Sequence, residues 1–461
     1  MSSAHRHVAV VGGGILGSTL ALRLAEAGVR VTLLERAPSF GGLAAAMDFD
    51  GHLVDRFYHV ITPADTRMVG VAEELGLGDQ LRFRPVKAGF FIDGAMHDFN
   101  GIGDLLRFSP LTPLQRARLA WFVGQCQLRS GYDGLDEIPL ITWLERHCGR
   151  GLTERIWKPL LDSRFEGRHD SLPATYLWAR TRRMSGARDK GAGGEQFGHL
   201  VGGHQRLIDA LVARARELGV EARAGEPVEG LVEERGRVVG VRIDGRVERF
   251  DLTIATLQPP ALERLLPEGL RPLLGSYPRR WIGVVCLLLK LRHSVSPYYA
   301  VNICDPTPIT TVVETSHVVG TEHTDGLRLV YLPRYCAPDA AEQTEPDESV
   351  YRRFTAQLAR MSPAFSHDDV AGWTVQRARY VEPVHGLRAE RRLAPVWPGV
   401  RGLGLVSNAQ IYPWLLNGDS VIRFAERVAG ETLTRLEAPW LAHRPTTPRI
   451  ASSTMSSSAT A

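Results

Sequence analysis

A glycine-rich turn near the N-terminus has the spacing of a dinucleotide-binding motif. An apolar strand from His7 to Val11 runs into Gly12, Gly14 and Gly17, which open a helix. In this pattern the first glycine makes a tight turn, the second lets the backbone approach a pyrophosphate, and the third allows close packing of the helix on the strand. The N-terminus of the helix attracts the anion. These residues predict a dinucleotide site.

Glu35 extends this site toward the ribose. It closes the strand that follows the helix. At that place a carboxylate can accept hydrogen bonds from both hydroxyls of an adenosine ribose. The same carboxylate would repel a 2′-phosphate, which disfavours NADP.

A run of basic side chains from Arg180 to Lys190 offers a second kind of chemistry. It includes Arg180, Arg182 and Arg183 and leads into a glycine-rich segment, which predicts a loop. The planar guanidinium group binds phosphate or carboxylate through two hydrogen bonds. Two interpretations stay open, a solvated loop and a site for an anionic group of the substrate.

Glu314 is a charged residue within the apolar strand Thr311 to Thr315. Charged side chains are rarely buried without a partner or a function. It is therefore a candidate catalytic base or substrate contact, and one partner of a buried ion pair is the alternative.

The composition is that of an ordinary globular protein. The chain has 461 residues, a net charge of +4, 44% hydrophobic and 23% charged residues, enough for two or three domains or one large interrupted fold. Because the positive charge is mostly spread out, we expect a small-molecule substrate and no nucleic-acid partner. Arginine greatly outnumbers lysine, which is typical of a GC-rich bacterial genome.

The cysteines and the apolar segments indicate in which compartment the protein works and whether it crosses a membrane. Five cysteines without CxxC pairs predict neither a disulfide framework nor a metal site, and favour the reducing cytoplasm. After the N-terminal strand, the longest apolar stretch, Trp281 to Leu291, is shorter than the roughly 20 residues of a membrane span, so no transmembrane segment is expected.

The elements that must position these residues form a mixed α/β pattern. The strand, helix and strand from His7 to Glu35 are followed by helical periodicity at Leu105 to Leu128 and at Trp143 to Leu161. Strands dominate from Trp281 to Tyr335, and a final helix covers Ser420 to Leu436.

From His7 to Ala438 these pieces, in this order, resemble the FAD-dependent amine oxidase superfamily. That superfamily includes monoamine oxidases, protoporphyrinogen oxidases, phytoene desaturases and, more distantly, UDP-galactopyranose mutases. Four motifs carry the resemblance: the first glycines with Glu35 and Gly41-Gly42; Gly202-Gly203 with Leu207; Pro227-Val228 with Asp251 to Thr256; and Gly404 to Val406 with Asn417 to Val421.

The resemblance implies an FAD cofactor. It is expected to be noncovalent because no cysteine lies between Gly402 and Ser420. Leu43 stands where many relatives have arginine, and Ser407-Asn408 replaces the usual Gly-Asp. The implied cofactor contacts are Gly12, Gly14, Ile15, Leu16, Gly17, Glu35, Arg36, Gly41, Gly42, Leu43, Arg56, Phe57, Tyr58, Val228, Asn417, Gly418, Ser420 and Val421.

The resemblance also implies where catalysis takes place. His59 falls in the segment that lines the flavin in relatives, with a satisfied core histidine as the alternative. Tyr412 and Trp414 precede the flavin-facing loop and are expected on one strand face as walls of the same pocket, with core packing as the alternative. Together with Glu314, these residues are the catalytic candidates.

The resulting fold class is α/β, a Rossmann-like FAD-binding domain with a discontinuous substrate domain made of a mixed sheet and a helical insert. We expect the FAD-binding domain at 1–80, 195–262 and 395–438, the helical insert at 81–194, the rest of the substrate domain at 263–394, and a disordered tail at 440–461.

The predicted function is that of an FAD-dependent oxidoreductase. It would remove hydride from a small polar substrate, sugar-like or from secondary metabolism. One alternative is a mutase in which reduced flavin acts on a nucleotide sugar without net redox. Another is work on lipid at a membrane surface, with Leu105 to Leu128 as an interfacial helix rather than an ordinary amphipathic one. Oligomeric state and electron acceptor are left open.

Overall fold

The structure is a computed structural model that describes residues 6–186 and 195–437. The predicted disordered tail at 440–461 and the end of the basic run, with Arg188 and Lys190, lie outside the described residues.

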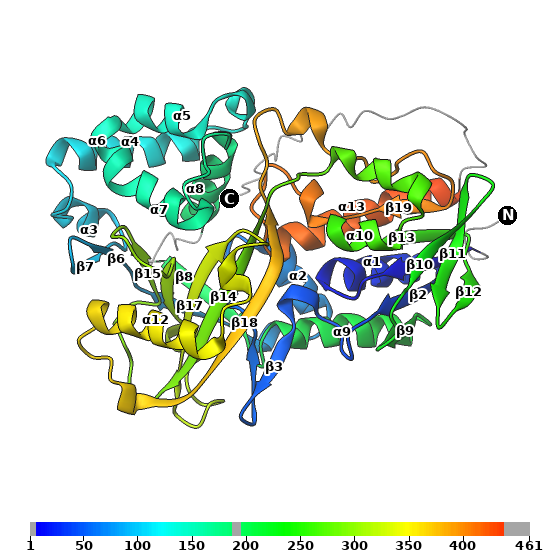
Figure 1. The fold of residues 1–461 in the computed structure, drawn as a ribbon, viewed down its shortest axis with the longest axis horizontal. Coiled ribbons are helices and arrows are strands. Elements are labelled where there is room, and N and C mark those ends of the chain that lie inside the picture. The colour runs from blue at the N-terminus through cyan, green and yellow to red at the C-terminus, as the bar shows by residue number, and fades with distance from the viewer. Residues whose placement is uncertain (1–5, 187–194, 438–461) are drawn as a thin grey trace, which may run out of the picture.

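A five-stranded parallel sheet forms one half of the molecule, with the strand order β19-β13-β1-β2-β9. Its strands are β1 (His7–Val11), β2 (Arg30–Glu35), β9 (Glu221–Ala224), β13 (Leu252–Ala255) and β19 (Leu403–Leu405). Helix α1 (Ile15–Glu26) packs against α9 (His204–Glu217) and α13 (Gly418–Glu437). Segments far apart in the sequence therefore meet at the carboxyl edge of this sheet, as Figure 1 shows.

A seven-stranded mixed sheet forms the second half, in the order β18-β14-β17-β16-β15-β6-β7. Its strands are β6 (Ala88–Ile92), β7 (Ala95–Asp98), β14 (Trp281–Leu291), β15 (Ala300–Ile303), β16 (Thr311–Glu314), β17 (Arg328–Cys336) and β18 (Val370–Pro383). Every residue of β14 is buried, because side chains alternate between two covered faces. One face packs on α12 (Asp347–Met361) and the other on the helical insert.

The helical insert differs in two ways from the sequence prediction. Residues 81–98 form strands rather than helices, so the helices begin at residue 102. The long periodic segment is two helices, because Thr112 caps a new helix with Pro113 in its first turn. The helices are α3 (Ile102–Arg107), α4 (Pro113–Leu128), α5 (Leu140–Cys148), α6 (Arg150–Leu152), α7 (Lys158–Phe165) and α8 (Thr175–Gly186), with a π-helical turn at Thr153–Trp157.

The arginines of the predicted basic loop lie on a helix instead. Arg180, Arg182 and Arg183 belong to α8, which continues to Gly186. The glycines that suggested a loop lie at and beyond its end, so the prediction began the loop too early.

Shorter elements complete the fold. They are the pair β3 (Ala46–Phe49) and β4 (His52–Asp55), the pair β5 (Leu81–Val86) and β8 (Glu195–Leu200), the sheet β10 (Gly230–Glu234), β11 (Arg237–Ile243) and β12 (Arg246–Arg249), and the helices α2 (Thr66–Glu74), α10 (Pro259–Leu265) and α11 (Ser316–Val319). Among the described residues, no helix has the length and apolar content needed to cross a bilayer. The domain boundaries expected from the sequence stay a prediction.

Candidate functional site

The first glycine turn is held by the protein's own packing at two positions. Gly12 has a φ of +111°, and a Cβ there would lie 2.8 Å from Thr256 Oγ1. A Cβ on Gly17 would lie 1.9 Å from the carbonyl oxygen of Gly12. Larger residues are therefore excluded at Gly12 and Gly17 by strand and helix packing alone.

Gly14 is different, because the protein leaves open the space where its side chain would stand. A Cβ there would meet nothing closer than 3.9 Å, and its φ of −75° suits any residue. Gly14 is the N-cap of α1, and no side chain caps this helix. Free N–H groups in the first turn and an open approach are the features that a pyrophosphate requires, so this turn fits FAD.

The second glycine pair lies directly beside the first turn. The N–H of Gly41 donates to the carbonyl of Gly13 at 2.9 Å, and Gly42 has a φ of +59°. Leu43 is half-buried in the short helical turn that follows, whereas Arg36 is exposed. Two backbone segments without side chains thus border the space in front of α1.

Glu35 lies at the carboxyl edge of β2, as expected of a ribose ligand. Its two carboxylate oxygens accept hydrogen bonds from the N–H groups of Gly13, at 2.7 Å, and Ala37, at 2.8 Å. The N–H of Glu226 donates to the Glu35 carbonyl at 3.0 Å, which brings Val228 near. Val228 is half-buried, and its main-chain N–H and C=O make no hydrogen bond with the described residues. These groups can serve an adenosine.

We expect Glu35→Ala to weaken FAD binding by about 1.5–3 kcal/mol, the value of a hydrogen bond to a charged group. The measurement is the FAD dissociation constant by titration of apoprotein. Glu226→Ala is the control. It removes a nearby carboxylate but keeps the main-chain N–H that donates to the Glu35 carbonyl, and it should leave FAD affinity unchanged. Equal affinity of wild type and Glu35→Ala would contradict the ribose assignment.

The segment before α13 is tied down by its own polar groups. Asn417 Oδ1 accepts the N–H of Ser420 at 2.8 Å, and Val421 N donates to the Asn417 carbonyl at 3.1 Å. A Cβ on Gly418 would lie 2.6 Å from the sulfur of Met68, so a larger residue there would require the Met68 side chain to shift. The four residues predicted as cofactor contacts here therefore also build the start of α13.

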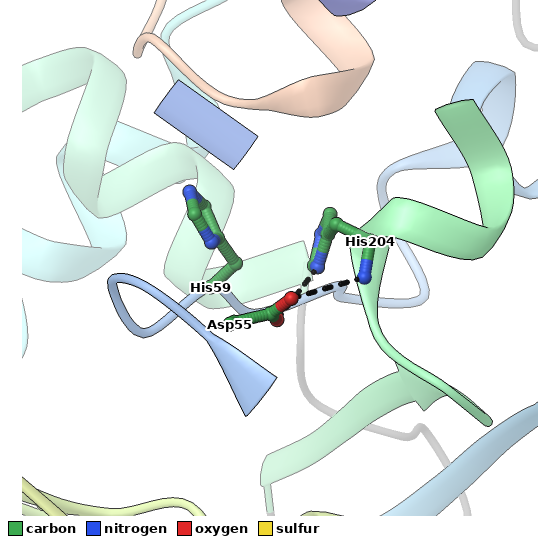
Figure 2. A group of neighbouring side chains, drawn as sticks. All are labelled: Asp55, His59 and His204. Atoms are coloured by element: carbon green, nitrogen blue, oxygen red, sulfur yellow. Dashed lines mark hydrogen bonds and ion pairs between the residues drawn. The ribbon is translucent and has the colours of Figure 1, made fainter. Parts of the chain in front are cut away.

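Three titratable side chains meet where β4 ends, in the segment after it and at the start of α9, as drawn in Figure 2. Asp55 accepts the main-chain N–H of His204 at 3.2 Å, and its second oxygen lies 3.2 Å from His204 Nδ1. The ring of His59 lies beside that of His204, with 4.8 Å between centroids. Asp55 thus stabilises the N-terminus of α9 and orients the His204 ring.

Burial sets the protonation of this group. It lowers the pKa of His59 to about 4, with a further contribution from His204, so His59 is neutral at physiological pH. Its Nδ1 is buried and has no hydrogen-bond partner in the described part of the chain. Burial would raise the pKa of Asp55, but its interactions with His204 outweigh burial and lower it. A neutral ring with an unused nitrogen can accept or orient a proton of a bound molecule.

The other predicted residues of this segment pack between the two halves of the molecule. Arg56 donates to Gln376 Oε1 at 3.2 Å and lies over the Phe57 ring. The hydroxyl of Tyr58 lies 2.9 Å from that of Tyr335. Phe57 and Tyr58 also contact the core beneath the insert.

The sequence predicts no metal site, but one group of side chains in this region could offer metal ligands. Asp55, His59 and His204 offer ligand atoms within 4.8 Å of one another. Tetrahedral bonds of about 2.0–2.1 Å place ligands only about 3.4 Å apart. Because His204 already occupies the Asp55 carboxylate, we assign no metal to this group.

A pocket opens between the insert and the segment before α13. Its volume, counted together with the open solvent at its mouth, is about 520 Å³. Tyr412 and Trp414 line it and His59 does not, and the convergence of all three side chains over the flavin stays a prediction. The two aromatic residues also do not lie on a strand. Tyr412 is buried and donates to Asp136, whereas Trp414 is 55% exposed, at the mouth.

Arg180 and Glu382 form the charged end of this pocket, and Arg164, which does not line it, also pairs with Glu382. Arg164 donates to Glu382, and Arg180 donates to the other carboxylate oxygen at 3.1 Å. Burial would raise the pKa of Glu382, but the two guanidinium groups lower it to about 2. Two positive charges share one negative charge here.

Uncharged donors surround this end as well. The Tyr176 hydroxyl and His385 Nε2 are buried without hydrogen-bond partners among the described residues. Both residues line the pocket together with Arg180 and Glu382. The pocket therefore has aromatic walls and a polar end that can donate hydrogen bonds to an anionic or polar group.

Only one of the three predicted anion-binding arginines reaches this pocket. Arg182 donates to the carbonyls of Arg129 and Ser130, and Arg183 pairs with Asp65 at 2.8 Å. The Asp65 carboxylate also lies 3.4 Å from Asn417 Nδ2. Internal partners thus occupy Arg182 and Arg183.

Glu314 lies on the face of the seven-stranded sheet that is opposite the insert, and its catalytic role stays a prediction. Its neighbour Val313 faces the insert side, so strand alternation points Glu314 toward α12. Its carboxylate accepts from Ser294 Oγ at 2.9 Å and from the N–H of Val295 at 3.1 Å. His317 Nε2 lies 3.6 Å from its other oxygen, and Glu314 raises the pKa of His317, which supports the alternative of a buried ion pair.

Sequence reasoning missed several residues of these sites. His204 follows the Gly202-Gly203 pair and Asp55 precedes Arg56, and a titratable residue at a helix start was an available signal. Arg164, Glu382 and His385 gave no local signal, because Arg164 and Glu382 are 218 positions apart.

The chain is similar to proteins of known family in sequence and in fold. The protein named "Probable zeta-carotene desaturase" from Synechococcus elongatus is 27% identical over 310 residues, 57% of this chain and 61% of that protein. Coproporphyrinogen III oxidase from Mycobacterium bovis is 27% identical over 301 residues, 58% of this chain and 62% of that protein. The chain thus spans about three fifths of the length of these curated relatives.

Solved structures share the fold over nearly the whole chain. Reduced UDP-galactopyranose mutase has a TM-score of 0.72 at 14% identity and covers 93% of this chain and 96% of its own. Putrescine oxidase bound to putrescine has a TM-score of 0.68 at 15% identity and covers 93% and 99%. The predicted α/β fold class is thereby confirmed.

The family model described as flavin containing amine oxidoreductase matches residues 19–398. It confirms the resemblance and, at the level of the family, the flavin cofactor. The chain belongs to the flavin containing amine oxidoreductase family.

Proposed function

We propose that the protein is an FAD-dependent oxidoreductase that removes hydride from a small organic substrate. The observation that carries the proposal is the open space at Gly14 in front of an uncapped helix, in a chain of a flavin-containing family. Noncovalent FAD, when bound, supplies the hydride acceptor. We also propose that the protein works in the reducing cytoplasm, because all five cysteines are free and buried.

The pocket between the insert and the segment before α13 is the proposed substrate site. Tyr412 and Trp414 supply aromatic walls that exclude water, and Arg180 with Glu382 supplies the polar end. These features support a polar substrate that contains a ring, in keeping with the sugar-like or secondary-metabolite class. His59 holds or receives a proton beside the flavin, and Asp55 with His204 positions it.

We expect Arg180→Gln to raise the KM of the true substrate by about tenfold to a hundredfold, because a hydrogen bond to a charged group is lost from the pocket. Steady-state kinetics with FAD content as a check measures this. Arg182→Gln is the matched control on the same helix, since Arg182 does not line the pocket and contacts the carbonyls of Arg129 and Ser130 and the Trp178 ring. An Arg180→Gln enzyme with wild-type KM would remove the anion contact from the proposal.

We expect His59→Ala to slow anaerobic flavin reduction by about tenfold to a hundredfold while FAD stays bound, because a positioning group is lost. Stopped-flow absorbance at the flavin band measures the rate. His293→Ala, an exposed histidine paired with Asp369, is the control and should reduce at the wild-type rate. Normal reduction of the His59→Ala enzyme would return His59 to a core role.

The alternative is a mutase that uses reduced flavin on a nucleotide sugar without net redox. The structural similarity to UDP-galactopyranose mutase keeps this candidate open. An oxidoreductase bleaches its flavin anaerobically with substrate alone, whereas a mutase needs prior reduction and consumes no reductant during turnover. Anaerobic mixing with a panel of polar ring compounds and nucleotide sugars separates the two.

A further inference from the structure

The outer side of α4 carries large apolar side chains where a surface helix normally carries polar ones. Leu114, Trp121 and Leu128 are 62%, 65% and 87% exposed. They stand seven positions apart, which places them along one line of a helix with about 3.6 residues per turn. Phe122 on the inner side is fully buried, so α4 has an ordinary core-facing side as well.

A fourth exposed apolar side chain lies on α3, next to α4. Leu106 is 66% exposed, and its carbonyl accepts a hydrogen bond from Arg116 of α4. The described residues contain eight exposed large apolar side chains, and four of them lie between positions 106 and 128. Single exposed apolar residues are ordinary, but such a concentration marks an interaction surface. We call Leu106, Leu114, Trp121 and Leu128 the apolar face.

The charges in the segment that carries the apolar face are almost all positive. Residues 102–130 contain four arginines and one acid, Asp104. The Asp104 carboxylate accepts the N–H of Asn100 at 2.9 Å, at the start of its own helix. Arg107 and Arg118 are exposed, and no carboxylate in the described part of the chain pairs with either. A surface that is apolar at its centre and basic at its margin is complementary to an anionic membrane surface.

We infer that the apolar face docks the protein on the surface of a membrane that contains anionic lipid. Leucine side chains enter the boundary of the acyl chains, the Trp121 ring lies at the headgroup level, and the arginines bind lipid phosphates. This inference goes beyond the proposed function and does not rest on it.

The test is co-sedimentation of the flavin-loaded protein with vesicles. Wild type should bind vesicles of equal parts phosphatidylcholine and phosphatidylglycerol, and bind them less in high salt. The variant Leu114→Ser/Trp121→Ser/Leu128→Ser should lose at least about tenfold in vesicle affinity. Arg107→Gln/Arg118→Gln should lose the preference for these vesicles over pure phosphatidylcholine.

The control is Val247→Ser, which removes an exposed apolar side chain from β12 at the other end of the molecule and should bind like wild type. FAD content and thermal unfolding report whether each variant is folded. Failure of wild type to bind either vesicle, or unchanged binding by the triple variant, would overturn the inference. Self-association of wild type that the triple variant abolishes, without vesicle binding, would instead make the apolar face an interface between copies.

Discussion

A Gly14→Val variant is expected to fold and to contain no FAD. The side chain would fill the space in front of α1 in which nothing of the protein lies within 3.9 Å of a Cβ, and which the cofactor pyrophosphate requires. Folding should lose only about 1 kcal/mol, because valine is a poor N-cap compared with glycine. The flavin absorbance per protein and the thermal unfolding curve give both results.

Two other glycines are controls for this prediction. Gly430→Val on α13 meets nothing within 4 Å and should keep its full FAD content. Gly17→Ala would place a Cβ 1.9 Å from the Gly12 carbonyl and should damage the fold itself. A Gly14→Val protein with wild-type FAD content would contradict the position given to the pyrophosphate.

A Glu382→Gln variant is expected to lose about 3–5 kcal/mol of unfolding free energy. The substitution leaves Arg164 without its negative partner in a pair whose side chains are only 22% and 13% exposed, and breaking a largely buried pair carries a cost of this size. Urea denaturation at neutral pH measures it. Glu137→Gln, which breaks an exposed pair with Arg391, should lose at most about 1 kcal/mol.

The same carboxylate gives a pH dependence with a definite sign. The pKa of Glu382 falls from its ordinary 4.5 to about 2 in the folded protein. Its stabilisation is therefore fully present above pH 4.5 and is lost as the pH falls toward 2. The difference between wild type and Glu382→Gln should shrink over that window. A difference that stays constant from neutral pH to pH 2 would contradict the assignment.

The local parts of the cofactor site were predictable because their signals lie in short segments. Gly12, Gly14 and Gly17 follow a buried strand, and Glu35 ends the next one, so turn geometry and strand order place them together. The structure also shows that the glycines of this motif have different roles, which the sequence pattern does not distinguish. Packing requires Gly12 and Gly17, whereas only a bound molecule requires Gly14.

The features that the sequence could not predict depended on tertiary partners. Glu314 reads as a charge in an apolar strand, and only the structure shows its contacts with Ser294 and His317. Arg182 and Arg183 looked free because their partners lie 52 to 123 positions away. The sequence predicted only part of the pocket. It identified the aromatic pair that precedes α13, but not the pairing of Arg164 with Glu382.

The central claim is tested most directly by the identity of the molecule that purified protein releases on denaturation. The account predicts yellow protein that releases one FAD per chain into the supernatant, identified by its mass and absorbance, with no flavin left in the precipitate. Release of NAD, absence of any flavin after reconstitution with FAD, or flavin that stays attached to the precipitated chain would contradict it.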